Sequence, residues 1–129
     1  MRMGALFFLG LSLLLLKGFS QSTYFSKTVD LRGYGEMTYA MIGVPDGYII
    51  TGGTTGVNNL FELFVTKLNF QGDTIWNKFI SHHVRSYTSG SNNCIVKRQQ
   101  GGFYVVGETR DTMGGNVDAI LYCFNDQGD

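Results

Sequence analysis

The sequence predicts an all-β protein built from two copies of one repeat, and three observations indicate this class. The string Asp46-Gly-Tyr-Ile-Ile-Thr-Gly-Gly-Thr54 returns as Gly101-Gly-Phe-Tyr-Val-Val-Gly-Glu-Thr109, with further matches on both sides. The 129 residues include 18 glycines and one proline, a composition rich in turns. No long helical pattern follows residue 20. Repetition at this scale sets the architecture, so every other segment is interpreted against it.

Each copy of the recurring string has the composition of a short strand. Residues 48–51 and 103–106 are aromatic, β-branched or apolar, and glycines flank both runs. Apolar and polar residues do not alternate, which predicts a strand covered on both faces. Gly52 and Gly107 end the two strands at the same place, where a missing side chain permits a bulge or a close backbone approach.

The first 20 residues have the pattern of a secretory signal peptide. Arg2 supplies the positive start, residues 4–16 form an apolar run, and Gly18-Phe-Ser20 offers small residues to a signal peptidase. Cleavage is expected before Gln21. The alternative is an uncleaved anchor helix, although the apolar run is shorter than the ~20 residues that a membrane crossing needs.

The charge of the chain argues against one class of partner. There are 10 basic and 10 acidic residues, and loss of Arg2 and Lys17 with the signal peptide leaves 8 basic against 10 acidic, a net charge of −2. We therefore expect no nucleic-acid binding through a basic surface. Membrane contact is expected only through an uncleaved signal segment, and the export machinery is an expected partner.

The elements that follow the signal peptide match in pairs. A strand is predicted at Thr23–Val29 and again at Thr74–Ile80, with Thr, an aromatic residue and Lys in register. Polar loops are expected over 30–38 and 81–93. A short strand at 39–42, matched by one at 93–96, then leads through a tight turn into the recurring string.

The third strand of each repeat, at 62–69 and 118–125, begins with an acidic residue and ends with Asn. A longer polar loop precedes each of these strands. The closing turn Asn69–Asp73 recurs as Asn125–Asp129, and its glycine is placed for the left-handed position of a hairpin loop.

Four short strands in roughly 55 residues is the unit size of a β-propeller blade. The predicted organisation is a signal peptide at 1–20 and propeller repeats at 21–129, with units at about 30–80 and 81–129. A propeller needs ~4 to 8 blades to close, so we expect an N-terminal fragment of a longer protein whose two termini share one blade. The fragment alone is expected to be poorly stable, because both open blade faces would expose apolar area.

The two cysteines, Cys94 and Cys123, belong to the first and third strands of one repeat, with the 103–106 strand expected between them. Strands two apart lie ~9.5 Å from one another, beyond the ~7 Å between Cα atoms that a disulfide spans. We predict two free, buried thiols.

Three segments of the chain together resemble a known class of repeat protein. The recurring string, followed by Phe64-Val-Thr-Lys-Leu-Asn69 and Gly72-Asp-Thr-Ile-Trp-Asn-Lys78, resembles the β-propeller repeats of exported bacterial proteins, especially those that end in a C-terminal sorting domain for type IX secretion. The resemblance covers essentially the whole mature chain and implies a propeller, without naming a ligand. Two segments depart from it: Ser81-His-His83 replaces a usual Gly-Gly pair, and Leu121-Tyr-Cys-Phe124 replaces a Leu-Val-Lys-Leu type of strand.

The sequence offers no catalytic constellation. His82 and His83 are the only histidines, and adjacent histidines in a strand point to opposite faces, so we expect solvated loop residues and no metal site. The glycine spacings lack the Gly-Lys-Ser/Thr end of a phosphate loop, and no cofactor is expected. Nothing sets two of the carboxylates at a catalytic separation; those weighed are Glu62, Glu108, Asp111 and Asp118.

Loop lengths indicate where a ligand would bind. In a four-stranded blade the 4-to-1 and 2-to-3 connections emerge on one face, and here those are the long ones. Arg and Tyr gather there, as they do on binding surfaces. The candidate ligand-face residues are Arg32, Tyr34, Tyr39, His82, His83, Arg85, Tyr87, Arg110 and Asp111.

The sequence thus predicts a secreted or cell-surface propeller module that binds or scaffolds a protein or glycan ligand, without catalysis in this stretch. Two alternatives stay open. One is the N-terminal propeller part of a secreted hydrolase or lyase. The other is a surface adhesin that binds glycans.

Overall fold

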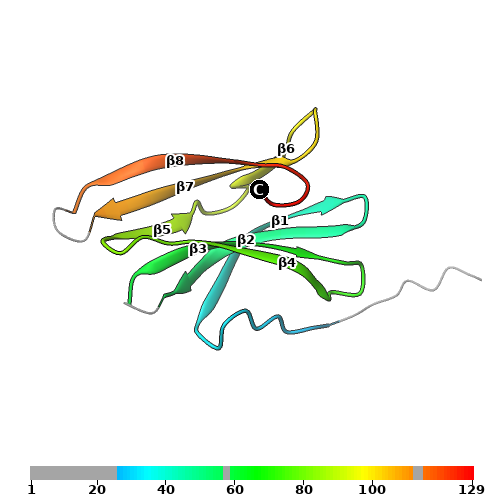
Figure 1. The fold of residues 1–129 in the computed structure, drawn as a ribbon, viewed down its shortest axis with the longest axis horizontal. Coiled ribbons are helices and arrows are strands. Elements are labelled where there is room, and N and C mark those ends of the chain that lie inside the picture. The colour runs from blue at the N-terminus through cyan, green and yellow to red at the C-terminus, as the bar shows by residue number, and fades with distance from the viewer. Residues whose placement is uncertain (1–25, 57–58, 112–114) are drawn as a thin grey trace, which may run out of the picture.

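The structure is a computed structural model, and it describes residues 26–56, 59–111 and 115–129. These residues form eight strands in two antiparallel sheets, with no helix among them (Figure 1). The prediction of an all-β fold is confirmed. The predicted signal peptide lies outside the described residues. Within those ranges, nothing helical is long and apolar enough to cross a membrane.

The first sheet, sheet A, is a simple meander. β1 (Glu36–Val44), β2 (Gly47–Thr55), β3 (Phe61–Leu68) and β4 (Thr74–Ile80) lie side by side in chain order, all antiparallel. The tight turn predicted between the first two strands is present at residues 45–46. The predicted four-stranded unit is therefore found in full, although β1 begins earlier than residue 39.

The second sheet, sheet B, has a divided first strand. β5 (Arg85–Ser89) and β6 (Ile95–Lys97) pair with β7 (Phe103–Asp111), and β8 (Val117–Phe124) also pairs with β7. β5 and β6 together take the place that β1 has in sheet A. The predicted loop over 81–93 is therefore wrong for β5. Its sequence Arg-Ser-Tyr-Thr-Ser has no apolar run, but the long β7 supplies an edge against which it pairs.

The glycines that end the recurring string play the same part in both sheets. A side chain at Gly52 would collide with the carbonyl oxygen of Met37, and one at Gly107 would collide with that of Thr88. The neighbouring strand is irregular just beyond each contact: β1 shifts register, and the second sheet divides its strand into β5 and β6. The predicted close backbone approach is confirmed.

The turns that close the third strands are also alike. The side-chain oxygens of Asn69 and Asn125 accept hydrogen bonds from the backbone N–H groups two and four residues later, at 2.8 to 2.9 Å. Gly72 and Gly128 have φ angles of 79° and 83°. The left-handed glycine predicted for this hairpin loop is confirmed.

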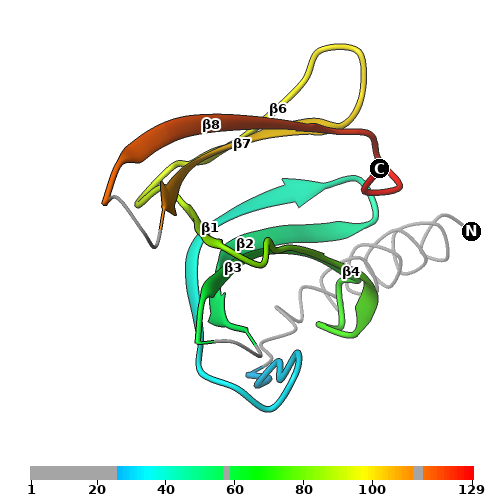
Figure 2. The ribbon, with the colours of Figure 1, turned by 60° about the vertical axis from the view of Figure 1, so that its left-hand side comes forward.

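The two sheets pack face to face around one apolar core, with sheet B above sheet A in both views (Figures 1 and 2). Trp76 of β4 stacks on Phe103, with ring centroids 6.4 Å apart, and Phe103 stacks on Phe124 at 5.1 Å. The buried residues of this core are Ile49, Leu63, Val65, Ile95, Phe103, Val105 and Phe124.

Residues 26–35 lie on the other side of sheet A, away from sheet B (Figure 1). Val29 and Leu31 pack against a second buried cluster, which consists of Ile50, Phe64 and Leu68. Residues 26–29 form no strand, so the predicted strand at 23–29 is wrong for its described part. Strand pairing needs a neighbouring strand edge, whereas this segment crosses the face of a sheet.

The segment nevertheless repeats the contacts of its sequence match, β4. Lys27 forms an ion pair with Asp73, and Lys78 of β4 forms one with Asp129 at 2.9 Å. The hydrogen bonds from the two lysines are the main cause of a lowered pKa at both aspartates. In each case the lysine reaches the third-strand turn of the sheet that follows it in the chain.

The two cysteines are free, as predicted, and β7 lies between them. Cys94 is buried, and this burial raises the pKa of its thiol. The predicted burial of Cys123 is wrong. Its side chain lies on a surface of the second sheet that no described residue covers, and it is therefore exposed.

Candidate functional site

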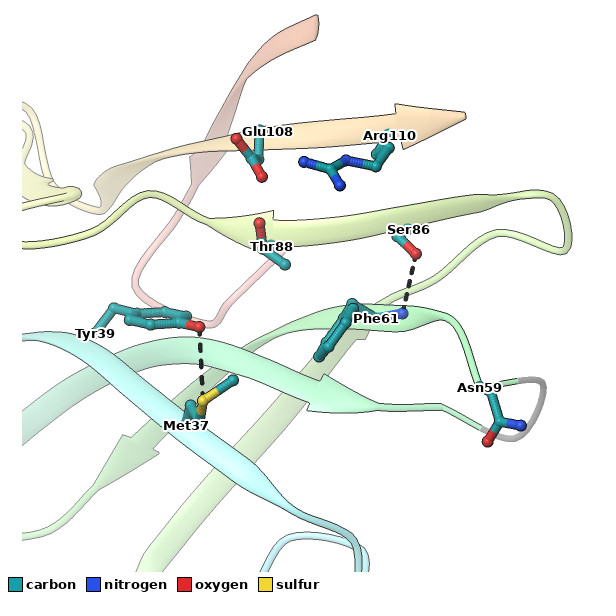
Figure 3. Close-up of a pocket in the computed structure, with 8 residues that line it drawn as sticks. All are labelled: Met37, Tyr39, Asn59, Phe61, Ser86, Thr88, Glu108 and Arg110. Carbon is teal, nitrogen blue, oxygen red and sulfur yellow. Dashed lines mark hydrogen bonds between the residues drawn. The ribbon is translucent and has the colours of Figure 1, made fainter. Parts of the chain in front are cut away.

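A cleft of about 420 Å³ lies where the two sheets meet, at the end of the molecule that carries the β2–β3 connection (Figure 3). β1 and β3 supply side chains from sheet A, and β5 and β7 supply them from sheet B. The lining residues are Met37, Tyr39, Asn59, Phe61, Ser86, Thr88, Glu108 and Arg110.

Tyr39 owes its position to the bulge in β1. The register with β2 shifts between Thr38 and Ala40, which leaves Tyr39 as the extra residue, and bulges commonly redirect a side chain in this way. Gly53 lies beside Tyr39, where a Cβ would be in ordinary contact, 3.7 Å from the Tyr39 ring and 3.8 Å from the Thr88 methyl group. The Tyr39 hydroxyl lies 3.9 Å from the Met37 sulfur, to which it donates a weak hydrogen bond.

Phe61 forms the opposite wall. Its side chain is 41% exposed, and its backbone N–H donates to the Ser86 hydroxyl at 3.2 Å (Figure 3). This hydrogen bond ties the first residue of β3 to β5 and so joins the two sheets at the mouth of the cleft. An aromatic ring held open to solvent beside a second ring gives the cleft two apolar surfaces.

The polar side of the cleft comes from sheet B. Thr88 lies directly opposite Glu108, and Ser86 directly opposite Arg110, in the pairing of β5 with β7. Directly paired residues point to the same face of a sheet, so two hydroxyls, one carboxylate and one guanidinium form a compact polar group. Among the described residues neither Glu108 nor Arg110 has a side-chain hydrogen bond or an ion pair. Both charges are available to a ligand.

The predicted ligand-face residues separate into several environments, and only Tyr39 and Arg110 line this cleft. Arg32 is engaged elsewhere: it donates to Glu62 at 2.6 Å and lies 3.6 Å from the centre of the Phe79 ring. Tyr87 packs against the core.

The other candidates lie outside the cleft. His82 and His83 are exposed and stacked on each other, with ring centroids 4.3 Å apart. Arg85 and Asp111 are opposite one another at the ends of β5 and β7. Tyr34 is half exposed in the segment before β1.

Six lining residues were not among the predicted ligand-face residues. They are Met37, Asn59, Phe61, Ser86, Thr88 and Glu108. Glu108 had the best chance of detection, since it replaces Gly53 and so marks a place inside the recurring string where the second copy gains a charge. Ser86 and Thr88 depend on β5, which the sequence did not reveal as a strand.

A second cleft, of about 580 Å³, lies at the opposite end, among the tight turns. It is larger, but its charged side chains are mostly engaged. Lys67 donates to Asp46 at 2.8 Å, and this hydrogen bond is the main cause of the lowered pKa of Asp46. Asp126 accepts the Gly102 N–H at 2.9 Å. These groups hold the turns together, so the first cleft is the better candidate site.

Across the described ranges, no three His, Cys, Asp or Glu side chains are grouped so that they could hold a metal ion. Comparison with protein-family models, with curated proteins and with solved structures finds no match for this chain.

Proposed function

We propose that this chain is a β-propeller-type repeat module of an exported bacterial protein, and that it binds a ligand in the cleft between its two sheets. The module scaffolds or binds rather than catalyses. The observation that carries the proposal is the cleft itself, in which two aromatic rings face a carboxylate and a guanidinium that have no ion pair among the described residues.

The propeller assignment is supported by the relation between the sheets. Both sheets are antiparallel, with matching third-strand turns and matching glycine contacts. The face of sheet B packs on the face of sheet A. Repetition of one sheet by stacking is the construction principle of propellers. Export is supported by the sequence of residues 1–20.

The side chains of the cleft favour binding of a sugar. Rings such as Tyr39 and Phe61 offer flat apolar surfaces, while hydroxyl, amide and charged groups offer hydrogen bonds, the mixture typical of small-molecule sites. Glu108 is the one carboxylate among the described lining residues, whereas hydrolysis of a glycosidic bond uses a pair. The composition therefore favours a glycan-binding module over a hydrolase.

A glycan array tests this proposal, with the processed chain as the probe and neutral and acidic oligosaccharides on the surface. We expect binding to a restricted set, weakened ~10-fold or more in Phe61→Ala and Arg110→Ala, since truncated aromatic and arginine anchors cost more than about 1.4 kcal/mol. Arg98→Ala, in the second cleft, is the matched control and should bind normally. Absence of binding, or equal binding by all variants, would contradict the proposal.

A further inference from the structure

The second cleft has one wall from each sheet, and each wall carries a lysine. Lys67 is directly paired with Ile49 in sheet A, and Lys97 is directly paired with Phe103 in sheet B. Directly paired residues point to the same face of a sheet, and Ile49 and Phe103 both belong to the core between the sheets. The two lysines therefore line the same cleft from opposite sides.

The ammonium group of Lys67 is poorly provided with acceptors for its burial. The Lys67 side chain is 11% exposed, and Asp46 is its one hydrogen-bond partner among the described residues. An ammonium group has three N–H donors, so two of them have no acceptor in that part of the chain. Because a buried donor without an acceptor is costly, an anion that enters the cleft is favoured there.

Lys97 supplies a second charge to the cleft. In the ranges that the structure describes, this exposed lysine makes no ion pair and no side-chain hydrogen bond. Arg98 also lines the cleft, although its guanidinium carbon lies 5.4 Å from the centre of the Tyr104 ring. The described lining has three cations and two carboxylates, an excess of one positive charge; these side chains are Lys67, Lys97, Arg98, Asp46 and Asp126.

Both carboxylates of the cleft already have a donor. Asp46 accepts from Lys67 at 2.8 Å, and Asp126 accepts the Gly102 N–H at 2.9 Å. Lys97 has no such partner, so the charge that remains uncompensated is positive. A ligand with a single negative charge balances it.

These charges are not part of the repeat. The lysine–aspartate pairs that hold the third-strand turns occur in both sheets, as expected of groups that each unit needs in order to fold. The charges of the second cleft occur in one copy only, which indicates a role for the cleft rather than for the unit. The equivalent positions are Lys67 and Cys123, Asp46 and Gly101, and Lys97 and Gly43.

The cleft is firmly built on one side and apolar on the other. The turn after β8 lies at the same end of the molecule as the β1–β2 turn (Figures 1 and 2). A Cβ at Gly128 would lie 2.9 to 3.0 Å from the Trp76 ring, so this turn rests on a ring that itself stacks on Phe103. Val44 and Pro45 form an apolar wall. A cleft of about 580 Å³ with an apolar wall and a few charged groups is typical of small-molecule sites.

We propose that the second cleft binds a small organic monocarboxylate. Its carboxylate accepts hydrogen bonds from the ammonium groups of Lys67 and Lys97, and its apolar part lies along Val44 and Pro45. Asp46 competes with this ligand for Lys67. The site lies at the opposite end of the molecule from the glycan cleft, and it does not depend on glycan binding.

Titration of the isotope-labelled, processed chain with benzoate, followed by two-dimensional NMR, tests this site. We expect saturable shifts of the amide signals of Lys67, Lys97 and Gly102. Lys97→Gln should raise the dissociation constant ~10-fold, since it removes a charge-assisted hydrogen bond, and Lys97→Arg should restore binding. Asp46→Asn should lower the dissociation constant several-fold, because it releases Lys67 and removes a repelling charge. Both altered side chains are exposed, so both variants should fold.

Two kinds of control accompany the titration. Arg110→Ala removes a cation from the first cleft and should leave benzoate binding unchanged. Benzylamine, which has the opposite charge, and inorganic phosphate, which carries more than one, should both bind more weakly than benzoate.

Four results would overturn the monocarboxylate site. They are the absence of saturable shifts, loss of benzoate binding in Arg110→Ala, weaker binding in Asp46→Asn, and tighter binding of benzylamine or phosphate than of benzoate. The glycan array is a separate measurement, in which Lys97→Gln should bind as the unaltered chain does, so failure of one site is distinguishable from failure of the other.

Discussion

Sheet A and sheet B are made to the same pattern, yet they occupy different environments. Both have the recurring string in the second position and the same Asn-to-Gly turn after the third strand. Sheet A is covered on one face by sheet B and on the other by residues 26–35, whereas sheet B is covered on one face alone. Burial of a strand residue in this molecule thus depends on what packs on its sheet. Residues at equivalent positions of the two sheets can therefore differ completely in solvent exposure.

The largest test of this comparison uses Val65 and Leu121, which are equivalent but 0% and 63% exposed. Val65→Lys buries a charge between the sheets, and we expect it to lower the free energy of unfolding by more than about 4 kcal/mol or to prevent folding. Leu121→Lys, measured in dilute protein, should change it by less than about 0.5 kcal/mol. Urea titration followed by circular dichroism gives both values. Similar losses at the two positions would show that sheet B is covered on both faces.

A second comparison uses the aromatic residues that open the recurring string. Phe103 is 1% exposed between Trp76 and Phe124, whereas its counterpart Tyr48 is half-buried and makes one edge-on contact, with Phe70 at 5.8 Å. Phe103→Ala should lower the free energy of unfolding by about 3 to 5 kcal/mol, and Tyr48→Ala should lower it by about 1 kcal/mol. The same urea titration measures the difference. If Tyr48→Ala proved as costly as Phe103→Ala, residues 26–35 would cover sheet A as completely as a sheet does.

A smaller effect concerns Tyr122, the counterpart of Thr66. Its hydroxyl is buried without a hydrogen-bond partner in the described residues, and burial, assisted by nearby Tyr87, raises its pKa to about 12. In the unfolded chain the Tyr122 hydroxyl ionises near pH 10. The stability that comes from keeping this hydroxyl neutral is therefore fully present below pH 10 and is lost as the pH rises to about 12. Tyr122→Phe should therefore flatten the fall in stability over this interval.

Thermal melts at a series of alkaline pH values measure this effect. A profile that is the same for Tyr122→Phe and the unaltered chain would place the Tyr122 hydroxyl in water.

Much of the fold could be predicted because local chemistry dictates it. The close approaches at Gly52 and Gly107 and the left-handed Gly72 and Gly128 follow from residue type and position. The division of sheet B into β5 and β6 could not be predicted, because Arg85–Ser89 has no apolar run and becomes a strand by pairing with the far half of β7. The same holds for the candidate site. Tyr39 and Arg110 were expected on a ligand face, but Phe61, Ser86 and Glu108 join them only because β5 pairs with β7.

By itself the sequence determined the all-β class, the two repeats, the strands of sheet A and the free state of both cysteines. Strand-forming composition, turn chemistry and strand spacing are properties of neighbouring residues. Tertiary structure alone decided that residues 26–29 cross a sheet face, that Cys123 is exposed, and that one carboxylate and one guanidinium face two aromatic rings. These outcomes depend on which surfaces meet, and surfaces far apart in the chain meet only when the apolar faces of whole sheets pack together.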